Sequence, residues 1–386
     1  MKLGKMNLPL KLKKIDIPFL PSKKILGVDL GSQTIKIVEL EQSKNGKWTL
    51  KKCAFESLGI AEIPPEEKKT ILIERLKEAL SREKFSTKRV ATSLSGNQVI
   101  VRYVNVPKLS AEELAKTIHF EAEAYIPFDI REVDLAFHIL GDLVEEGEKK
   151  METVLVAVKK DVIQNRIEIL EKVGLEPAII DIDAFAIESA LELARQPVST
   201  ERGEAETKET IVVVNLGASV TNLTIIENGI SKVVRDIFIA GNTFTKVIQQ
   251  SLNLDFPKAE ELKRKHGLST EEVATPEITT SEEKSSEKVE VAKVLTTVIS
   301  DLIKEIQHSI EYYQSQLPEE VQVSRVLLTG GSALLSNIGR YFAQELQLPV
   351  EIYNPFLYLN TPVNLPKEIN EKNTIFTIAI GLAIRQ

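Results

Sequence analysis

Apolar strand patterns recur in two separate parts of the chain, and each pair ends at the same kind of turn. Residues 25–30 and 211–216 are apolar, largely β-branched runs that lead into Asp-Leu-Gly and Asn-Leu-Gly. A second strand pattern follows each turn, at 34–40 and 221–227. Short apolar runs bounded by turn residues are typical of buried strands. Because internal repetition is a strong architectural signal, we expect two copies of one α/β unit.

The periodicity of the remaining chain predicts further elements around these two copies. A first unit is predicted to comprise residues 25–106 and 179–195. In addition to the strands above, it contains strands at 48–58, 89–94 and 99–106 and a helix at 66–82. Ser110 and Glu113 form a capping-box pattern that starts an inserted α+β unit at 107–178. The second unit comprises 211–254 and 317–386, with a helical part at 255–316. The order of elements predicts an α/β fold with two halves.

Two polar stretches are expected to connect these units. Residues 196–210 are rich in Pro, Ser, Thr, Glu and Gly and are predicted to link the halves. Residues 269–290 have many Ser, Thr and Glu and almost no large apolar side chains, so we expect a mobile loop there. A long helix is predicted to begin at about 289 and end near 316.

Charge is distributed unevenly over the 386 residues, whose net charge is −7. Residues 1–24 contain seven lysines and one aspartate, so they form a basic, flexible arm on an acidic body. The acidic body argues against nucleic-acid binding. The arm is either a solvated tail or a contact to an anionic membrane surface. The lone Cys53 excludes an internal disulfide, and the longest apolar run, 376–384, is shorter than the roughly 18 residues of a membrane span. We therefore expect a cytoplasmic protein.

Three glycine turns are candidates for binding phosphate or a nucleoside. Consecutive N–H groups in a glycine-containing turn form a concave anion site, and glycine allows close approach. Any one such turn is ordinary, but three that follow matched strands favour a shared ligand. The candidate residues of the three turns, in chain order, are Gly31, Ser32, Gln33 and Thr34; Gly217, Ala218, Ser219 and Thr221; and Gly330, Gly331, Ser332 and Leu334.

Two further motifs allow both a structural and a functional interpretation. Glu260, Lys263 and Arg264 share one face of a predicted helix, where they form either a solvated charged face or hydrogen bonds to a ribose and contacts to an adenine. Tyr125, Ile126, Pro127 and Phe128 end a predicted helix. This apolar group is either core packing or the rim of a groove for an extended peptide.

These motifs together resemble the actin, Hsp70 and sugar-kinase superfamily, which has a duplicated, ribonuclease H-like α/β fold. Within it, the chain resembles the PilM family of type IV pilus assembly proteins, and the FtsA family is a near relative. The resemblance covers residues 25–385 and rests on the segments 29–32, 36–40, 121–128, 215–223 and 330–332. It implies that 107–178 is an FtsA-type subdomain 1C inserted into subdomain 1A, and that the second half consists of subdomains 2A and 2B.

The resemblance also implies ligands and partners. ATP and Mg²⁺ would occupy the cleft between the halves, and Asp29 would hold the Mg²⁺ through water. Lys36, Asn215 and the first two glycine turns would surround the phosphates. The third turn, with Glu260 and Lys263, would hold the nucleoside. The groove between subdomains 1A and 1C would take the N-terminal cytoplasmic peptide of the membrane protein PilN. The protein would then lie at the inner membrane and connect platform proteins to a motor ATPase.

One residue departs from the pattern of the hydrolytic members. Asn215 stands where many superfamily ATPases have a second acid, and an amide cannot act as a base. In the first connecting segment, 181–190, no Gln or Glu is clearly placed to orient water, and Asp181 and Asp183 are the only acids near the site. We therefore expect slow or no ATP hydrolysis. An FtsA-like filament-forming protein and a sugar-kinase-like enzyme of the same superfamily are the alternatives.

Overall fold

The computed structural model describes residues 24–59, 63–145, 147–195, 209–268, 282–317, 321–362 and 365–385. The predicted arm 1–24, except Lys24, therefore lies outside the described residues, as does most of the predicted linker, 196–208. Thr210, which we assigned to that linker, is the first residue of a strand.

The first half is built on a five-stranded sheet with the order β3-β2-β1-β4-β8. The strands β1, β2 and β3 form an antiparallel meander, and β4 and β8 join parallel to β1. All five residues of β1 are buried, which explains its continuous apolar run. The bounds are β1 (Leu26–Leu30), β2 (Thr34–Gln42), β3 (Trp48–Ser57), β4 (Arg89–Leu94) and β8 (Glu176–Ile182).

The second half repeats this sheet strand by strand, in the order β11-β10-β9-β12-β13. Again three antiparallel strands are followed by two parallel ones. The duplication that the sequence predicts is thereby confirmed. The bounds are β9 (Thr210–Leu216), β10 (Thr221–Glu227), β11 (Ile230–Ile237), β12 (Arg325–Thr329) and β13 (Val350–Ile352).

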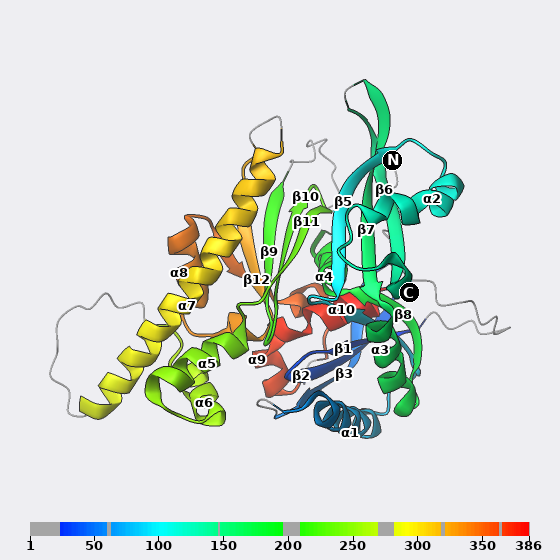
Figure 1. Ribbon diagram of the computed structural model, residues 1–386. Coiled ribbons are helices and arrows are strands. Elements are labelled where there is room, and N and C mark those ends of the chain that lie inside the picture. The colour runs from blue at the N-terminus through cyan, green and yellow to red at the C-terminus, as the bar shows by residue number, and fades with distance from the viewer. Residues whose placement is uncertain are drawn as a thin grey trace.

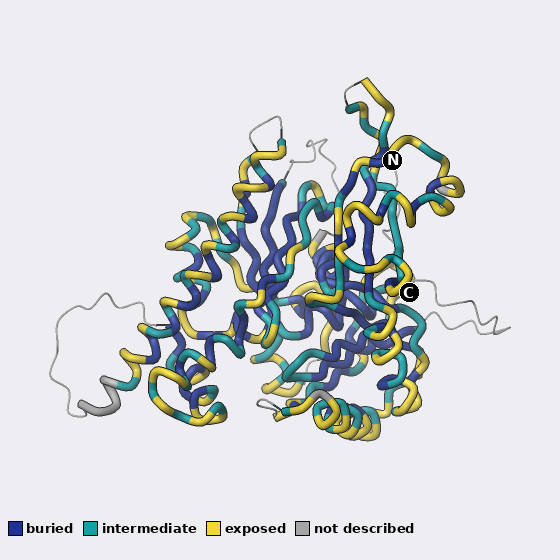
Figure 2. The backbone as a smooth tube through the Cα atoms, in the orientation of Figure 1, coloured by how far each residue is buried: buried dark blue, intermediate teal, exposed yellow. Residues whose placement is uncertain are grey.

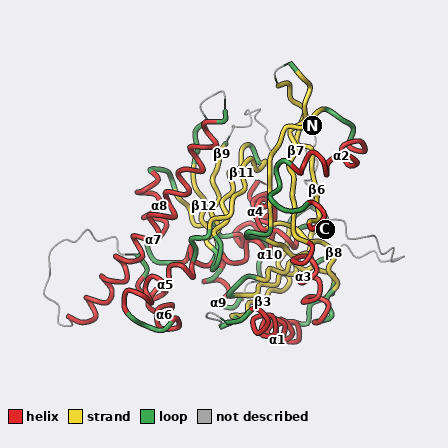
Figure 3. Tube along the Cα trace, in the orientation of Figure 1, coloured by secondary structure: helices red, strands yellow, loops and turns green. Residues whose placement is uncertain are grey.

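Helices cover the two sheets and fill the space between them (Figure 1). Figure 3 shows most helices of the second half on one side of its sheet, with α7 as the longest. The helices of the first half are α1 (Pro65–Glu83), α3 (Lys160–Lys172) and α4 (Asp183–Glu192). Those of the second half are α5 (Gly241–Leu252), α6 (Phe256–His266), α7 (Glu282–Ser315), α8 (Ile338–Leu346), α9 (Lys367–Glu371) and α10 (Thr377–Ala383).

A third sheet, of order β5-β7-β6, stands on the first half. Its strands are β5 (Val99–Pro107), β6 (Val133–Glu145) and β7 (Glu148–Lys159), and α2 (Ala111–Glu123) packs on one face. The predicted capping box is present, since Ser110 Oγ accepts from Glu113 N at 3.3 Å and Glu113 Oε2 accepts from Ser110 N at 2.9 Å. Figure 2 shows the exposed tip of the β6–β7 hairpin projecting away from the buried strands.

The strand pairing differs from two predicted boundaries of this inserted unit. We placed 99–106 in the first unit, but β5 pairs with β7 of the third sheet. Conversely, α3 lies within the predicted insert, yet Ile169 and Leu170 pack in the core of the first sheet. Contacts with residues distant in sequence determine which sheet β5 and α3 belong to. Local periodicity could therefore not predict either assignment. The division into subdomains otherwise remains a prediction.

The predicted mobile loop at 269–290 is wrong for its last part. Helix α7 begins at Glu282, and Val291 and Leu295 anchor the following turns in the core of the second half. A helix continues past its buried segment at little cost because propagation adds one hydrogen bond for each residue fixed. The rest of the predicted loop, 269–281, lies outside the described residues.

Two glycines allow the backbones at the centre of the molecule to approach closely. A Cβ at Gly381 of α10 would lie 1.7 Å from the carbonyl oxygen of Ala186 in α4. A Cβ at Gly27 of β1 would lie 1.8 Å from the carbonyl oxygen of Ala379 in α10. No side chain fits at these distances, so glycine is needed for α10 to lie between β1 and α4.

We expect Gly381→Ala to lower the free energy of unfolding by about 3 kcal/mol, because an overpacked core residue forces the backbone apart. Urea denaturation measures the change. Gly141→Ala is the control, since its Cβ would meet no heavy atom within 4 Å and the expected change is within about 0.5 kcal/mol. Equal destabilisation by the two variants would contradict the packing argument.

Candidate functional site

A cavity of about 830 Å³ opens between the two halves. The first and second glycine turns line it together with Gly330 and Gly331, and α1, α3, α5 and α6 contribute side chains. Its volume lies in the range of small-molecule sites, roughly 300–1,000 Å³. The three turns that the sequence singled out therefore meet at one cavity.

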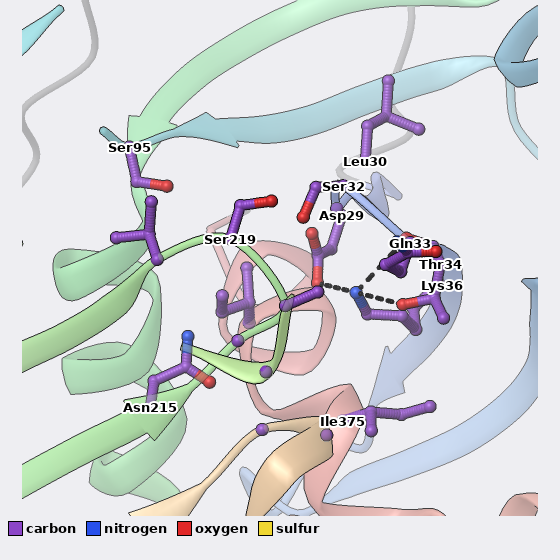
Figure 4. Close-up of a pocket in the computed structure, with 18 of the residues that line it drawn as sticks. Asp29, Leu30, Ser32, Gln33, Thr34, Lys36, Ser95, Asn215, Ser219 and Ile375 are labelled. Carbon is purple, nitrogen blue, oxygen red and sulfur yellow. Dashed lines mark hydrogen bonds and ion pairs between the residues drawn. The ribbon is translucent and has the colours of Figure 1, made fainter. Parts of the chain in front are cut away.

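The first turn carries a buried ion pair. Asp29 and Lys36 are opposite residues of the antiparallel pair β1 and β2, and Asp29 Oδ2 lies 2.6 Å from Lys36 Nζ. Lys36 Nζ also donates to Thr34 Oγ1 at 3.2 Å (Figure 4). Gly31 N donates to Thr34 O at 3.0 Å and closes the turn. Within the part of the chain that the structure describes, the N–H groups of Ser32 and Gln33 have no backbone partner, so they are available to a ligand.

The second turn packs against the start of α5. Gly241 N donates to Gly217 O at 3.0 Å, and Asn242 N donates to Ala218 O at 2.7 Å. These bonds hold the turn after β9 against the helix. Asn215, the last polar residue of that strand, is buried, and its Nδ2 donates to Asn222 Oδ1 at 2.7 Å. The amide that replaces an acid is therefore part of a hydrogen-bonded pair.

The third turn follows β12, the neighbour of β9. Gly330 has φ 87°, and a Cβ there would lie 2.5 Å from Asn215 Oδ1. Gly331 has open space beside it, since a Cβ there would meet only Ile375 Cγ2, at 3.9 Å. A short 3₁₀ helix, Gly331–Leu334, follows this turn, and α8 begins at Ile338.

The charged residues of α6 form one network at the end of the cavity. Glu260 lies 2.5 Å from Lys263 Nζ and 2.7 Å from Arg264 Nε. Burial opposes the charged form of Glu260, but Lys263, Thr245 and Arg264 hold its pKa below the usual value. Lys263 Nζ also donates to Gly241 O at 3.0 Å, so the buried lysine supports the start of α5. The Arg264 side chain is exposed, whereas those of Lys263 and Glu260 are mostly buried, so this face of α6 is only partly solvated. A contact of these residues with a ribose or an adenine stays a prediction.

Asn242 is a site residue that the sequence analysis missed. Gln33 Nε2 of the first half donates to Asn242 Oδ1 at 3.3 Å, across the cavity. Asn242 Nδ2 in turn donates to Ser219 Oγ at 3.1 Å. Asn242 therefore connects the first two glycine turns. The sequence feature that could have identified Asn242 is its position directly after Gly241, at the start of a helix.

Of the two acids that the sequence analysis names in the first connecting segment, Asp183 lines the cavity and Asp181 does not. Both acids lie at the junction of β8 and α4, but Asp181 is buried and pairs with Arg385 Nε at 2.7 Å. Asp183 lines the cavity and accepts a hydrogen bond from Ser93 Oγ at 2.5 Å. Burial, and next the nearby Asp29 carboxylate, raise its pKa to about 6. Asp29 and Asp183 thus both line the cavity.

The structure shifts one predicted cavity residue by one position, from Thr221 to Asn222. The cavity is lined by Asn222 and not by Thr221, whose buried Oγ1 donates to Ile239 O at 2.7 Å. Successive side chains of a strand point to opposite faces, so a shift of one residue exchanges core and cavity. The other predicted residues of the cleft all line the cavity.

The predicted peptide rim divides into exposed and buried residues. Tyr125 is 42% exposed and Pro127 is exposed, whereas Ile126 is buried in the core of the third sheet. Phe128 is partly buried, with Lys159 Nζ 4.9 Å from its ring centroid. The core interpretation is therefore confirmed for Ile126, whereas a peptide contact of the exposed Tyr125 and Pro127 stays a prediction.

Two matching sheets, with a cavity between the two halves, define an actin-like protein. Comparison with known proteins agrees. A sequence profile of the family described as type IV pilus assembly protein PilM matches residues 27–386. The chain belongs to this PilM family.

Solved structures and curated relatives extend the comparison. The structure of a PilM–PilN type IV pilus biogenesis complex is 27% identical, covers 95% of this chain and 99% of its own, and has a TM-score of 0.76. The ethanolamine utilization protein EutJ from Carboxydothermus hydrogenoformans, at 16% identity and TM-score 0.51 over 95% of this chain and 91% of its own, shares the fold. FtsA from Neisseria meningitidis is 28% identical over 202 residues, 50% of this chain and 45% of FtsA, so the match spans about half of either chain.

We expect Asp183→Asn to stabilise the protein at pH 7.5 and to have a smaller effect near pH 4. The raised pKa means that the folded protein keeps a proton that the unfolded chain loses between about pH 4 and about pH 6. The contribution of the Asp183 carboxyl to the free energy of unfolding therefore falls as pH rises through that window. The asparagine amide does not titrate, so the variant does not lose this stability. Urea denaturation at both pH values measures it. Asp301→Asn, on the exposed face of α7, is the control. The same stability gain for Asp183→Asn at both pH values would contradict the assignment.

Proposed function

We propose that this chain is a nucleotide-binding adaptor of a type IV pilus assembly platform. The observation that carries the proposal is the convergence of glycine turns from both halves on one cavity of about 830 Å³. The available N–H groups of the first turn and the buried Lys36 suit phosphate oxygens. The third turn and the α6 network, at the other end, suit a nucleoside. ATP fits this division of the cavity in size and chemistry.

A magnesium ion would be held near Asp29 and Asp183. Mg²⁺ in proteins is usually bound by one or two carboxylates together with waters and substrate phosphates. Asp29 and Asp183 both line the cavity, and burial, followed by the charge of Asp29, raises the pKa of Asp183. This donor set fits a hydrated Mg²⁺, which would neutralise phosphate charge when bound.

The nucleotide is proposed to act mainly as a structural ligand. Asn215 carries no charge, and its Nδ2 is committed to Asn222, so it offers no base to an attacking water. A ligand that binds only the folded protein stabilises it by mass action, by about 2.7 kcal/mol at a hundredfold excess over Kd. ATP would thus bind both halves beside the hydrogen bond between Gln33 and Asn242 and would stabilise their contact.

The proposed partner is the N-terminal cytoplasmic peptide of PilN. The relative of TM-score 0.76 is a PilM–PilN complex, which supports a partner of this kind. The exposed Tyr125 and Pro127 at the end of α2 offer apolar contacts beside the long edge strand β6. Recruitment by PilN would bring the protein to the inner membrane, where it would contact platform proteins and a motor ATPase. No helix in the described parts of the chain has the length and apolar character needed to cross a membrane.

We expect the purified protein to bind ATP and Gly331→Leu to weaken that binding at least tenfold. Gly331 lines the cavity and has open space beside it, so a leucine there would fill the nucleoside end without distorting the backbone. Calorimetric titration gives the affinity, and thermal unfolding without ligand checks the fold. Gly141→Leu, in the third sheet, is the matched control and should bind as the parent does. Absence of ATP binding by the parent would overturn the proposal.

We expect a synthetic PilN N-terminal peptide to bind the protein, and Tyr125→Ala to weaken it at least fivefold. The tyrosine is 42% exposed, so its removal changes a contact surface more than the core. Fluorescence anisotropy of a labelled peptide measures the affinity. Leu357→Ala, an exposed apolar residue of the second half, is the control. Equal affinities for the parent and both variants would exclude Tyr125 from the peptide site.

A further inference from the structure

Apart from the glycine turns, the cavity is also lined by α1 and α3, and we refer to this part of it as the recess. Lys68 and Leu72 of α1 line one side of this recess, and Asn165, Arg166 and Ile169 of α3 line the other. None of these five residues belongs to the glycine turns or to the α6 network. The recess therefore adds a distinct set of side chains to the nucleotide cavity.

Arg166 is an unusual lining residue because no carboxylate of the described residues forms an ion pair with it within 4.0 Å. Its Nη1 donates to Thr92 Oγ1 at 3.1 Å, and the carboxylates of Asp183 and Asp29 lie in its surroundings. A guanidinium carries five N–H donors in a planar fork that matches a carboxylate or phosphate. Burial lowers the pKa of Arg166, so an anion at this point would compensate an existing desolvation cost.

Lys68 places a second cation on the opposite wall of the recess. The adjacent Lys69 lies 3.1 Å from Glu168 and is therefore paired. Lys68 has no such partner in the described parts of the chain, and burial lowers its pKa. Two helices distant in sequence thus each contribute one cation to the lining of the same cavity. The combination suits a single multiply charged anion.

The other described cations that line the cavity are already paired with carboxylates. Lys36 lies 2.6 Å from Asp29, and Lys372 lies 2.6 Å from Glu368. The paired cations of α6 lie at the end that suits a nucleoside, on the second half. A nucleotide held there would extend its phosphates past the first two glycine turns toward α3. Its terminal phosphate would carry the largest charge into the recess.

We propose that Arg166 and Lys68 form an anion subsite that binds the terminal phosphate of a nucleoside triphosphate. This inference rests on the proposed nucleotide binding and adds specificity to it: the protein distinguishes a triphosphate from a diphosphate. The same contact links the ligand to the third sheet, because β7 ends at Lys159 and α3 begins at Lys160. A terminal phosphate on Arg166 therefore acts on the helix that continues directly from the sheet of the proposed partner site.

The test compares the affinities of a non-hydrolysable ATP analogue and of ADP, each with Mg²⁺, for the full chain and its variants. We expect the parent to bind the triphosphate at least tenfold more tightly than ADP. Arg166→Gln and Lys68→Gln should each reduce this ratio at least fivefold and change the affinity for ADP less than twofold. Arg166→Lys should retain part of the preference because it keeps the charge. Lys69→Gln is the matched control and should leave the ratio unchanged.

The outcomes separate this inference from the function on which it rests. A parent that binds neither nucleotide overturns both. A parent that binds both nucleotides, with the same ratio in Arg166→Gln and Lys68→Gln, overturns the subsite and leaves nucleotide binding intact. Equal losses of triphosphate and ADP affinity in these variants also overturn it, since that pattern indicates a general structural role. Lys68→Gln alters only a lining side chain of α1, so it decides the question even where Arg166→Gln does not fold.

Discussion

The two halves are held in position by an exchange of central helices. Helix α4 follows the first sheet but packs with Ile211 and Val213 of the second, while α10 follows the second sheet and packs on β1 of the first. Gly381 and Gly27 permit this arrangement, because any Cβ at either position would overlap a backbone oxygen. The strands that carry the glycine turns are thus fixed to one shared layer. The cavity exists because that layer brings the ends of β1, β9 and β12 to a common point.

A hydrogen-bonded relay connects this cavity with the third sheet. Asn215 donates to Asn222, and Asn222 Nδ2 donates to Asp236 Oδ1 at 2.7 Å. Asp236 Oδ2 then accepts from Gly96 N at 2.5 Å, in the loop that leads into β5. Contacts of Tyr103 with Ser231 at 2.9 Å and of Lys232 with Glu152 at 2.8 Å join the same two parts. The second glycine turn and the inserted unit therefore form one bonded network across both halves.

The sequence predicts the features of this fold that are local and repeated. Each glycine turn follows a short buried strand, which a run of a few apolar residues is enough to predict. The two similar copies of this pattern revealed the duplicated fold. Features that depend on distant partners were missed. Strand β5 belongs to the third sheet only because β7 lies beside it. Arg166 enters the site because α3 packs beside β4, which no local pattern indicates. The register of β10 illustrates the same limit at the scale of one residue, because its pairing with β9 places Asn222 opposite Asn215 and leaves the adjacent Thr221 in the core.

The relay also gives a physical reason for an amide at position 215. Asp236 accepts hydrogen bonds from both Asn222 Nδ2 and Gly96 N, so Asn222 must present its Oδ1 to residue 215. Oδ1 of Asn222 needs a donor there, and Asn215 Nδ2 supplies one at 2.7 Å. An ionised aspartate has only acceptors, so it would oppose two oxygens in a buried position. An ionised acid at 215 is therefore incompatible with the bonds that join this turn to the third sheet.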